Sequence, residues 1–207
     1  MSSILYCVIH TQHQDDRANS ILSTWGKDKN LLFYSDHSVP EKNIYKVCDQ
    51  SDYASGQMKQ INVFDLLKKS FTNYSWYFFC DNDTFVNTKK LDEYIFNADI
   101  SSIHGSIINC WPIDRSLYYP SGGAGYLMHY SIFNLMNDLQ YNNTQFSDVS
   151  IGINFKEKNI KLINSELFKS QRPEFYNISD KDIKKYISFH YITTPSMMQH
   201  LQYQTYL

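Results

Sequence analysis

The amino-acid sequence predicts an α/β fold with a mixed, mostly parallel central sheet, because strand-like and helix-like segments alternate along the chain. An apolar, strand-like run at residues 4–9 precedes residues 15–25, whose apolar side chains recur at helical spacing. A second strand-like run follows at residues 31–34. Helical spacing returns at residues 55–71, directly before the aromatic run at residues 76–80. Repeated strand-helix units of this kind are typical of a parallel sheet with helices on its faces.

Turn and capping residues delimit the remaining elements. Asp15 or Asp16 can cap the first helix, and Gly26 can end it. Thr194 followed by Pro195 predicts the start of a helix at the carboxyl end, with Thr as the cap and Pro at the first helical position. Between these points we expect strands at 44–48, 103–108 and 187–192, a glycine-marked segment at 118–129, and helices at 88–95 and from 131 through 139.

Length and charge narrow the classes of protein. With 207 residues and no linker or repeat, we expect one domain over residues 1–207. The formal net charge of -2, without a Lys/Arg cluster, excludes an electrostatic footprint for nucleic acid or an anionic membrane. No apolar run approaches the length of a transmembrane segment, and the amino terminus lacks the layout of a signal peptide. We therefore expect a cytoplasmic protein.

The cysteines fit the same expectation. Cys7, Cys48, Cys80 and Cys110 are far apart in the sequence, and Cys7 and Cys80 fall inside apolar strand-like runs. Burial as small hydrophobic side chains is the simpler interpretation than a disulfide or a zinc site.

The most informative motif is Asp81-Asn82-Asp83, which directly follows the aromatic run. Two carboxylates at the carboxyl end of a strand suit Mg²⁺ or Mn²⁺, and open α/β sheets bind ligands at that edge. Asp and Asn also end strands simply by forming turns, so the motif alone leaves both interpretations open.

Three other segments carry possible chemistry, each with a structural alternative. Residues 121–125, Ser-Gly-Gly-Ala-Gly, allow a ligand to approach the backbone closely but also suit a bulge or a tight turn. Asp148 can act in chemistry or cap a helix that starts there. His190 can bind a metal or sit as a satisfied histidine in the core.

Taken together, the motifs resemble glycosyltransferase family 31, which includes Fringe and the core 1 β1,3-galactosyltransferase. The resemblance spans nearly the whole chain, and its terminal stretch from Phe189 to Tyr203 looks most like the core 1 enzyme. The ordered motifs that carry it are Arg17 through Thr24-Trp25-Gly26, Asp81 through Val86, Ser121 through Tyr126, Asp148 through Gly152, and Ser188 through Tyr191.

This resemblance implies a GT-A fold that uses a nucleotide-sugar donor and a divalent cation, Mn²⁺ with Mg²⁺ as an alternative. It implies that Asp83 and His190 ligate the metal, and that Asp81 contributes near the ribose or a metal-bound water. Asp148 is then the base of an inverting transfer. The resulting set of donor-binding residues is Thr11, Arg17, Asp36, Asp81, Asn82, Gly122 and Gly123.

The implied reaction moves a hexose from a UDP-sugar to a hydroxyl of a glycan, glycoprotein or glycolipid, forming a β1,3 linkage. Galactose is the favoured sugar, with N-acetylglucosamine or glucose as alternatives. The chain departs from the family at Asn82, where Asp is frequent, and at residues 169–171, where Fringe carries histidines. It also lacks the anchor of the Golgi members, so a Golgi location applies only if the chain is part of a longer eukaryotic enzyme.

Two other functions remain open from the sequence. A metal-dependent hydrolase of sugar nucleotides or phosphodiesters could use the same cation and aspartate to activate water. A carbohydrate-binding module could use the many tyrosines for stacking on sugar rings.

Overall fold

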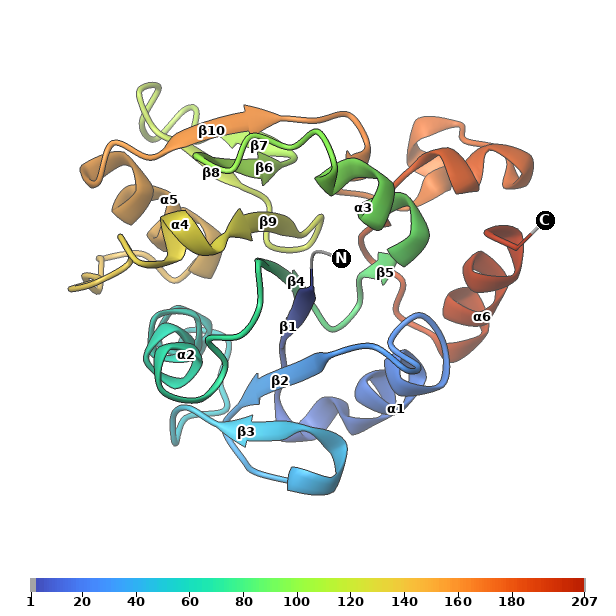
Figure 1. Ribbon diagram of the computed structural model, residues 1–207, viewed down its shortest axis with the longest axis horizontal. Coiled ribbons are helices and arrows are strands. Elements are labelled where there is room, and N and C mark those ends of the chain that lie inside the picture. Colours follow the sequence, from blue (N-terminus) through green and yellow to red (C-terminus); the bar gives the residue numbers. More distant parts are fainter. Residues whose placement is uncertain (1–2, 207) are drawn as a thin grey trace.

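The central element of the computed structural model, which describes residues 3–206, is a seven-stranded sheet (Figure 1). Its strand order is β10-β6-β9-β4-β1-β2-β3. Strand β9 pairs antiparallel with both of its neighbours, and all other adjacent pairs are parallel. The sheet is therefore mixed and mostly parallel, as predicted. Its strands are β1 (Ile4–Ile9), β2 (Leu31–Ser35), β3 (Ile44–Lys46), β4 (Trp76–Asp81), β6 (Ser102–Gly105), β9 (Tyr126–His129) and β10 (Lys161–Asn164).

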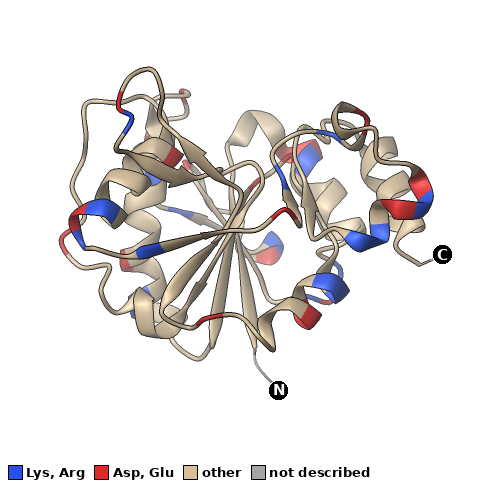
Figure 2. Ribbon diagram, turned by 90° about the horizontal axis from the view of Figure 1, so that it is seen from above, with Lys and Arg blue, Asp and Glu red and all other residues tan. Residues whose placement is uncertain are grey.

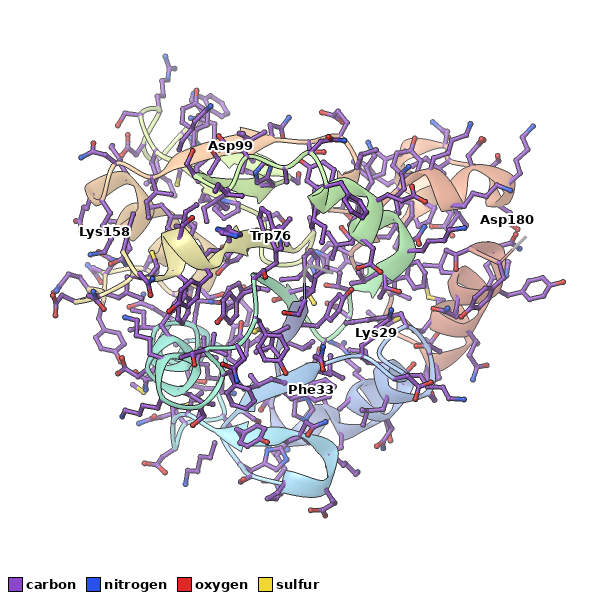
Figure 3. The ribbon with its side chains drawn as sticks, in the orientation of Figure 1. Lys29, Phe33, Trp76, Asp99, Lys158 and Asp180 are labelled. Atoms are coloured by element: carbon purple, nitrogen blue, oxygen red, sulfur yellow. The ribbon has the colours of Figure 1, made fainter. Side chains whose placement is uncertain are left out.

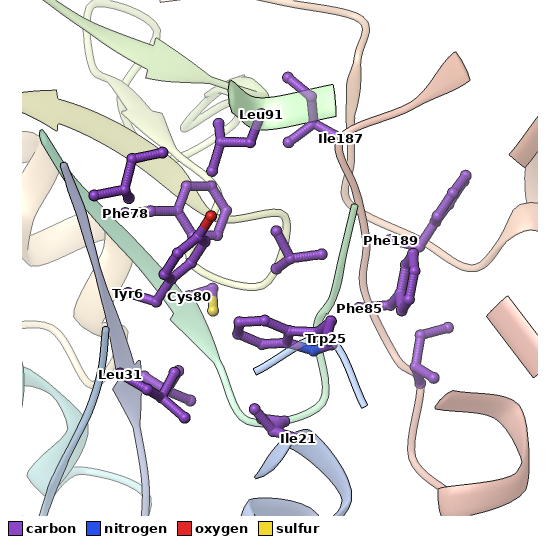
Figure 4. Close-up of a cluster of buried hydrophobic side chains, with 14 of the residues drawn as sticks. Tyr6, Ile21, Trp25, Leu31, Phe78, Cys80, Phe85, Leu91, Ile187 and Phe189 are labelled. Carbon is purple, nitrogen blue, oxygen red and sulfur yellow. The ribbon is translucent and has the colours of Figure 1, made fainter. Parts of the chain in front are cut away.

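Helices cover both faces of this sheet, because β1 and β4 are apolar on both sides. Successive strand side chains point to opposite faces, so Tyr6 and Phe78 enter one core while Cys7 and Phe79 enter the other. The first core, shown in Figure 4, is closed by α1 (Asp15–Ser23), α3 (Thr88–Ile95) and α6 (Pro195–Gln204). The second is closed by α2 (Ser55–Ser70), α4 (Tyr130–Phe133) and α5 (Ser147–Glu157).

Aromatic packing fills both cores. Tyr77 stacks on Phe133 with ring centroids 4.6 Å apart, and Phe79 stacks on Tyr126 at 5.1 Å. In the other core, Trp25 is buried and donates its indole N–H to the Thr84 carbonyl at 3.0 Å. This bond ties the end of the first βα unit to the turn that follows β4.

Two small sheets extend the carboxyl edge of the main sheet. One joins β5 (Phe85–Val86) to β12 (Ser188–Phe189) antiparallel, with β11 (Phe168–Lys169) parallel on the far side of β12. The other pairs β7 (Ile107–Asn109) with β8 (Tyr118–Pro120). Four 3₁₀ helices complete the described chain: η1 (Gln12–Gln14), η2 (Pro40–Lys42), η3 (Pro173–Tyr176) and η4 (Asp180–Lys185).

Most predicted elements are confirmed, including the Thr194 cap, whose hydroxyl accepts the Met197 N–H at 3.3 Å. The helix predicted from 131 through 139 is wrong: α4 stops at Phe133, and Asp138 adopts a left-handed φ of 52° that no helix allows. The strand predicted at 103–108 breaks at Ser106, between β6 and β7. Neither Asp15 nor Asp16 is the cap of α1, since both lie inside its first turn after Gln14.

The strand predicted at 187–192 is also shorter in the structure. Only Ser188 and Phe189 pair, because their partner strands β5 and β11 are two residues long each. Tyr191 then turns the chain away with a left-handed φ of 60°.

The outer surface is mixed in charge, with Lys, Arg, Asp and Glu interspersed around the ribbon (Figure 2). Side chains such as Phe33 and Trp76 lie in the interior, whereas Asp180 lies at the periphery (Figure 3). All four cysteines are free and buried, as predicted. Among residues 3–206, no helix combines the length and the hydrophobicity that crossing a bilayer requires.

Gly125, directly before β9, provides a test of how tightly the glycine segment packs on the core. Its φ is +76°, and a Cβ there would lie 2.3 Å from Phe78 Cζ, a buried ring. We expect Gly125→Ala to lower the free energy of unfolding by about 2 to 5 kcal/mol, from backbone strain and overpacking together. Denaturant titration measures this, with Gly56→Ala as control.

The control residue opens α2, where a Cβ would meet its nearest neighbour at 3.7 Å. Gly56→Ala should therefore stay within about 1 kcal/mol of the parent protein. Equal stability of the two variants would show that the Gly125–Phe78 contact is not restrictive.

Candidate functional site

The candidate site lies where β1, β2 and β4 end, because these parallel strands present their carboxyl ends at one edge. Ile9 pairs in register with Asp81, so the residues after β1 and the Asp81-Asn82-Asp83 turn are neighbours. The Thr84 N–H donates to the Asp81 carbonyl at 3.2 Å and closes this turn. Position in the sheet alone thus brings the predicted acidic motif into the crevice expected for α/β folds.

Strand pairing brings His190 to the same place. Phe85 pairs with Phe189, so the residues just before β5 and just after β12 are adjacent. The Ile192 N–H then donates to the Asp83 carbonyl at 2.8 Å. His190 is therefore not a histidine of the apolar core.

Asp81, Asp83 and His190 form a compact cluster whose ligand atoms all lie within 4.8 Å of one another. His190 Nε2 lies 3.2 Å from Asp83 Oδ1 and 3.6 Å from Asp81 Oδ2. These separations are near the roughly 3 Å expected between neighbouring ligands of a six-coordinate ion. Two carboxylates and one imidazole also suit Mn²⁺ chemically, so the residues fit the implied metal.

Gly123 makes room for the histidine ring. A Cβ at this position would lie 2.0 Å from His190 Cε1 and 2.1 Å from its Nδ1. These distances are too short for any side chain, so only glycine fits here. The loop is fixed from two sides: Thr84 donates its hydroxyl to the Gly123 carbonyl at 2.7 Å, and Ser188 donates to the Ala124 carbonyl. The glycine segment is thus a close approach of backbone to side chain.

The charges of the cluster perturb one another. Burial raises the pKa of Asp81; His190 opposes this, while the carboxylates of Asp83 and Asp148 add to it. For Asp83, burial acts upward, but the hydrogen bond and charge of His190, with help from Arg17, hold its pKa below the usual value. Burial alone would lower the pKa of His190, yet the hydrogen bond and charge of Asp83, together with the charge of Asp81, outweigh it and raise that pKa. The cluster therefore attracts positive charge.

Asp148 lies on the other side of the glycine loop. It is the second residue of α5, and its Oδ2 accepts the Gly122 N–H at 3.4 Å while Oδ1 accepts the Val149 N–H at 2.9 Å. Burial raises its pKa, although these hydrogen bonds act against the shift. The carboxylate therefore serves its own helix with one oxygen and faces the loop beside Asp81 with the other.

The remaining predicted residues divide into two groups. Arg17 is in the cluster, since its Nη1 lies 3.5 Å from Asp83 Oδ2 and donates to Asn82 Oδ1 at 3.1 Å. Asn82 bonds outside the two carboxylates, since its amide also donates to Gln14 Oε1 at 2.7 Å. Asp36 instead supports Thr11, whose hydroxyl donates to Asp36 Oδ2 at 2.9 Å.

Asp36 has an unusually stable charge for a buried carboxylate. Burial alone would raise its pKa, but hydrogen bonds from Ser35, His37, Thr11 and the Gln12 backbone hold it well below the usual value. Lys59, which the sequence analysis did not single out, is buried nearby with its Nζ 3.8 Å from Asp36 Oδ2. A polar residue on a helix gives no sign in the sequence that it will turn inward to a strand end.

Two clefts meet at this cluster. The first, about 430 Å³, contains Thr11, Arg17, Asn82, Asp83 and Lys59 in its lining. The second, about 400 Å³, is lined by Asp148, Gly122 and Gly123, and by aromatic side chains that the sequence analysis missed: Trp111, Tyr119 and Phe146. Asp36 lines neither cleft. The residues shared by both linings are Tyr53, Asp81, Ser147, His190 and Tyr191.

Comparisons with known proteins support the fold. No protein-family model and no curated protein matches the chain. A glycosyltransferase involved in the glycosylation of the major capsid of PBCV-1 matches in structure with a TM-score of 0.58 and 16% identity, over 96% of this chain and 98% of that one. Glycosyltransferase GlyE of Streptococcus pneumoniae TIGR4 matches with a TM-score of 0.54 and 12% identity, over 94% of this chain and 55% of that one. The chain therefore has the GT-A fold.

Proposed function

We propose that this protein is a metal-dependent glycosyltransferase that moves a hexose from a UDP-sugar to an acceptor hydroxyl. The observation that carries the proposal is the position of the Asp81–Asp83–His190 cluster in the wall between two clefts, one of them containing Asp148. A transfer reaction needs this arrangement, since donor and acceptor must meet at one reacting carbon. The structural neighbours named as glycosyltransferases support the same class.

The first cleft suits the nucleotide diphosphate of the donor. Arg17 and Lys59 supply positive charge in its lining, and Thr11 is held there by its bond to Asp36. Asp81, Asp83 and His190 would hold Mn²⁺ at the border of this cleft. Mg²⁺, a harder cation that prefers oxygen ligands, is the alternative. When bound, such a cation neutralises the charge that develops on the departing diphosphate. Gly122 leaves space for the sugar beside the cluster, and Gly123 contributes by giving room to the His190 ring.

The second cleft suits the acceptor. Asp148 lies in its lining, is buried enough to have a raised pKa, and has one oxygen on the glycine loop beside Asp81. We assign it as the base that removes the proton of the acceptor hydroxyl as that oxygen attacks the anomeric carbon. One displacement inverts the anomeric centre, so an α-linked donor gives a β-linked product.

The aromatic lining of the second cleft favours transfer over hydrolysis. Trp111 and Phe146 are 62% and 41% exposed, and such rings stack on the apolar faces of sugars. A hydrolase that only activates water has no need of this surface. We therefore propose a glycan, glycoprotein or glycolipid as acceptor rather than water.

The finer assignment follows the ordered motifs described above. Their resemblance to glycosyltransferase family 31 supports a Fringe-like or core 1-like enzyme that uses UDP-galactose, with UDP-N-acetylglucosamine or UDP-glucose as alternatives, and forms a β1,3 linkage. The retained outer carboxylates of the Asp81-Asn82-Asp83 motif agree with metal binding despite Asn at its centre. Product analysis with each UDP-sugar tests the donor.

Metal binding and UDP binding should be coupled. We expect Asp83→Ala to abolish the Mn²⁺-dependent gain in UDP affinity, because it removes one of three ligands, and EDTA to do the same to the parent protein. Gly123→Ala should also weaken Mn²⁺ binding, since the alanine Cβ would overlap the His190 ring. Calorimetry with UDP, with and without Mn²⁺, measures all three.

Gly122→Ala is the matched control for the loop. A Cβ there would lie 3.5 Å from Asp81 Oδ1, an ordinary contact, so its Mn²⁺ affinity should stay near that of the parent protein. UDP affinity that survives EDTA unchanged would overturn the proposed metal-held diphosphate.

Asp148→Asn tests the assigned base. Asn keeps the size and the acceptor for the Val149 N–H, so stability should change by no more than about 1 kcal/mol. Turnover should fall on the order of 10² to 10⁴-fold, because general-base catalysis is lost, while UDP and Mn²⁺ binding survive. Initial rates at saturating donor and Mn²⁺ measure this, and a near-normal rate would place the base elsewhere.

A further inference from the structure

A second cluster of metal-ligating side chains lies next to the first cleft, whose lining includes His10. His10 directly follows β1, Asp15 begins α1, and His37 follows β2 by two residues. Because β1 and β2 are parallel and in register at Ile9 and Tyr34, both histidines reach the same edge of the sheet. Their ring centroids lie 5.5 Å apart, with Asp15 beside both of them.

The distances resemble those of a four-coordinate metal site. Asp15 Oδ1 lies 2.9 Å from His10 Nε2 and 3.6 Å from His37 Nε2, and the three ligand atoms lie within 4.8 Å of one another. Ligands about 2.0 Å from a tetrahedral zinc ion are separated by roughly 3.3 Å. A small inward movement of His37 would therefore complete three positions.

One atom of this cluster lacks a partner. His37 Nε2 is buried and accepts or donates no hydrogen bond among the residues that the structure describes. Its other nitrogen, Nδ1, contacts Ser35 Oγ at 3.0 Å and Asp36 Oδ1 at 3.2 Å, so the ring orientation is fixed. A carboxylate on one imidazole nitrogen with the second nitrogen free is the usual outer arrangement of a metal-bound histidine.

His10 is also prepared for a metal. Its side chain is fully buried, and its Nε2 faces Asp15 Oδ1 at 2.9 Å. Asn82 Nδ2 lies 3.3 Å from its Nδ1, so the ring has a polar neighbour at each nitrogen. The Asp15 side chain is 42% exposed, so the cluster has one ligand in contact with solvent.

We propose that His10 Nε2, His37 Nε2 and the Asp15 carboxylate form a Zn²⁺ site, separate from the Asp81–Asp83–His190 cluster. Two imidazoles and one carboxylate are a common zinc set, with water in the fourth position. Imidazole ligands and the stability order of divalent ions favour Zn²⁺ over Mn²⁺ here, whereas two carboxylates favour Mn²⁺ at the other cluster. Bound zinc would join the ends of β1 and β2 to the start of α1 and thereby stiffen one wall of the first cleft.

The test separates the two clusters by mutation. In an Asp83→Ala background, which disables the first cluster, equilibrium dialysis with Zn²⁺ alone should find one bound ion. Adding His37→Gln should weaken that binding more than about 100-fold, since even loss of an outer partner costs 10 to 100-fold. Adding His200→Gln, the control on α6, should leave it unchanged.

A second readout keeps the wild-type background in case the double variant does not fold. Co²⁺ in a four-coordinate histidine site absorbs visible light far more strongly than in an oxygen-rich six-coordinate site. Wild-type protein should gain this absorption, and His37→Gln should lose it while far-UV circular dichroism stays the same. Equal Zn²⁺ affinity with and without His37, or no four-coordinate Co²⁺ signal in the wild type, would overturn the proposal. Neither readout depends on sugar transfer.

Discussion

The antiparallel pairing of β5 with β12 is the interaction on which the candidate site depends. Phe85 and Phe189 face each other across this ladder, and both are fully buried. Their pairing brings together an acidic turn and a histidine that are more than 100 positions apart in the sequence. Two-residue strands supply few hydrogen bonds of their own. The ladder is therefore stabilised mainly by the hydrophobic effect of burying these two rings. The geometry of the charged cluster is therefore set by apolar packing behind it.

The polar groups around the clefts are arranged so that few buried charges stand alone. Lys59 donates to the His10 carbonyl at 3.0 Å and lies near Asp36, and Arg17 bridges Asn82 and Asp83. Burying such pairs costs desolvation energy, and their mutual attraction offsets this cost only when their geometry is good. Their concentration at one sheet edge, rather than through the cores, agrees with a role in ligand binding.

The sequence predicted the parts of the fold that depend on local patterns. β1 and β4 are easy to predict because burial on both faces gives each strand a continuous apolar run. α2 is easy to predict because burial along one stripe gives apolar residues at helical spacing. The helix after Ser131 failed because Asn134, Asn137 and Asp138 interrupt an otherwise apolar pattern with poor helix formers. Lys59, Trp111 and the histidines after β1 and β2 were missed, since only strand register and tertiary packing bring them to the clefts.

The left-handed backbone of Tyr191 has a consequence for motion. A bulky residue at a φ of 60° stores strain, and here it lies between the His190 N–H, bonded to Lys169, and the Ile192 N–H, bonded to Asp83. Since neither bond belongs to the seven-stranded sheet, we expect the segment to open locally, and Tyr191 to relax, while that sheet stays intact. Amide protons at positions 190 and 192 then exchange by local opening, at a lower free energy than those of β1. We expect a ligand held by both His190 and Asp83 to slow this exchange, because it adds contacts between the same two segments.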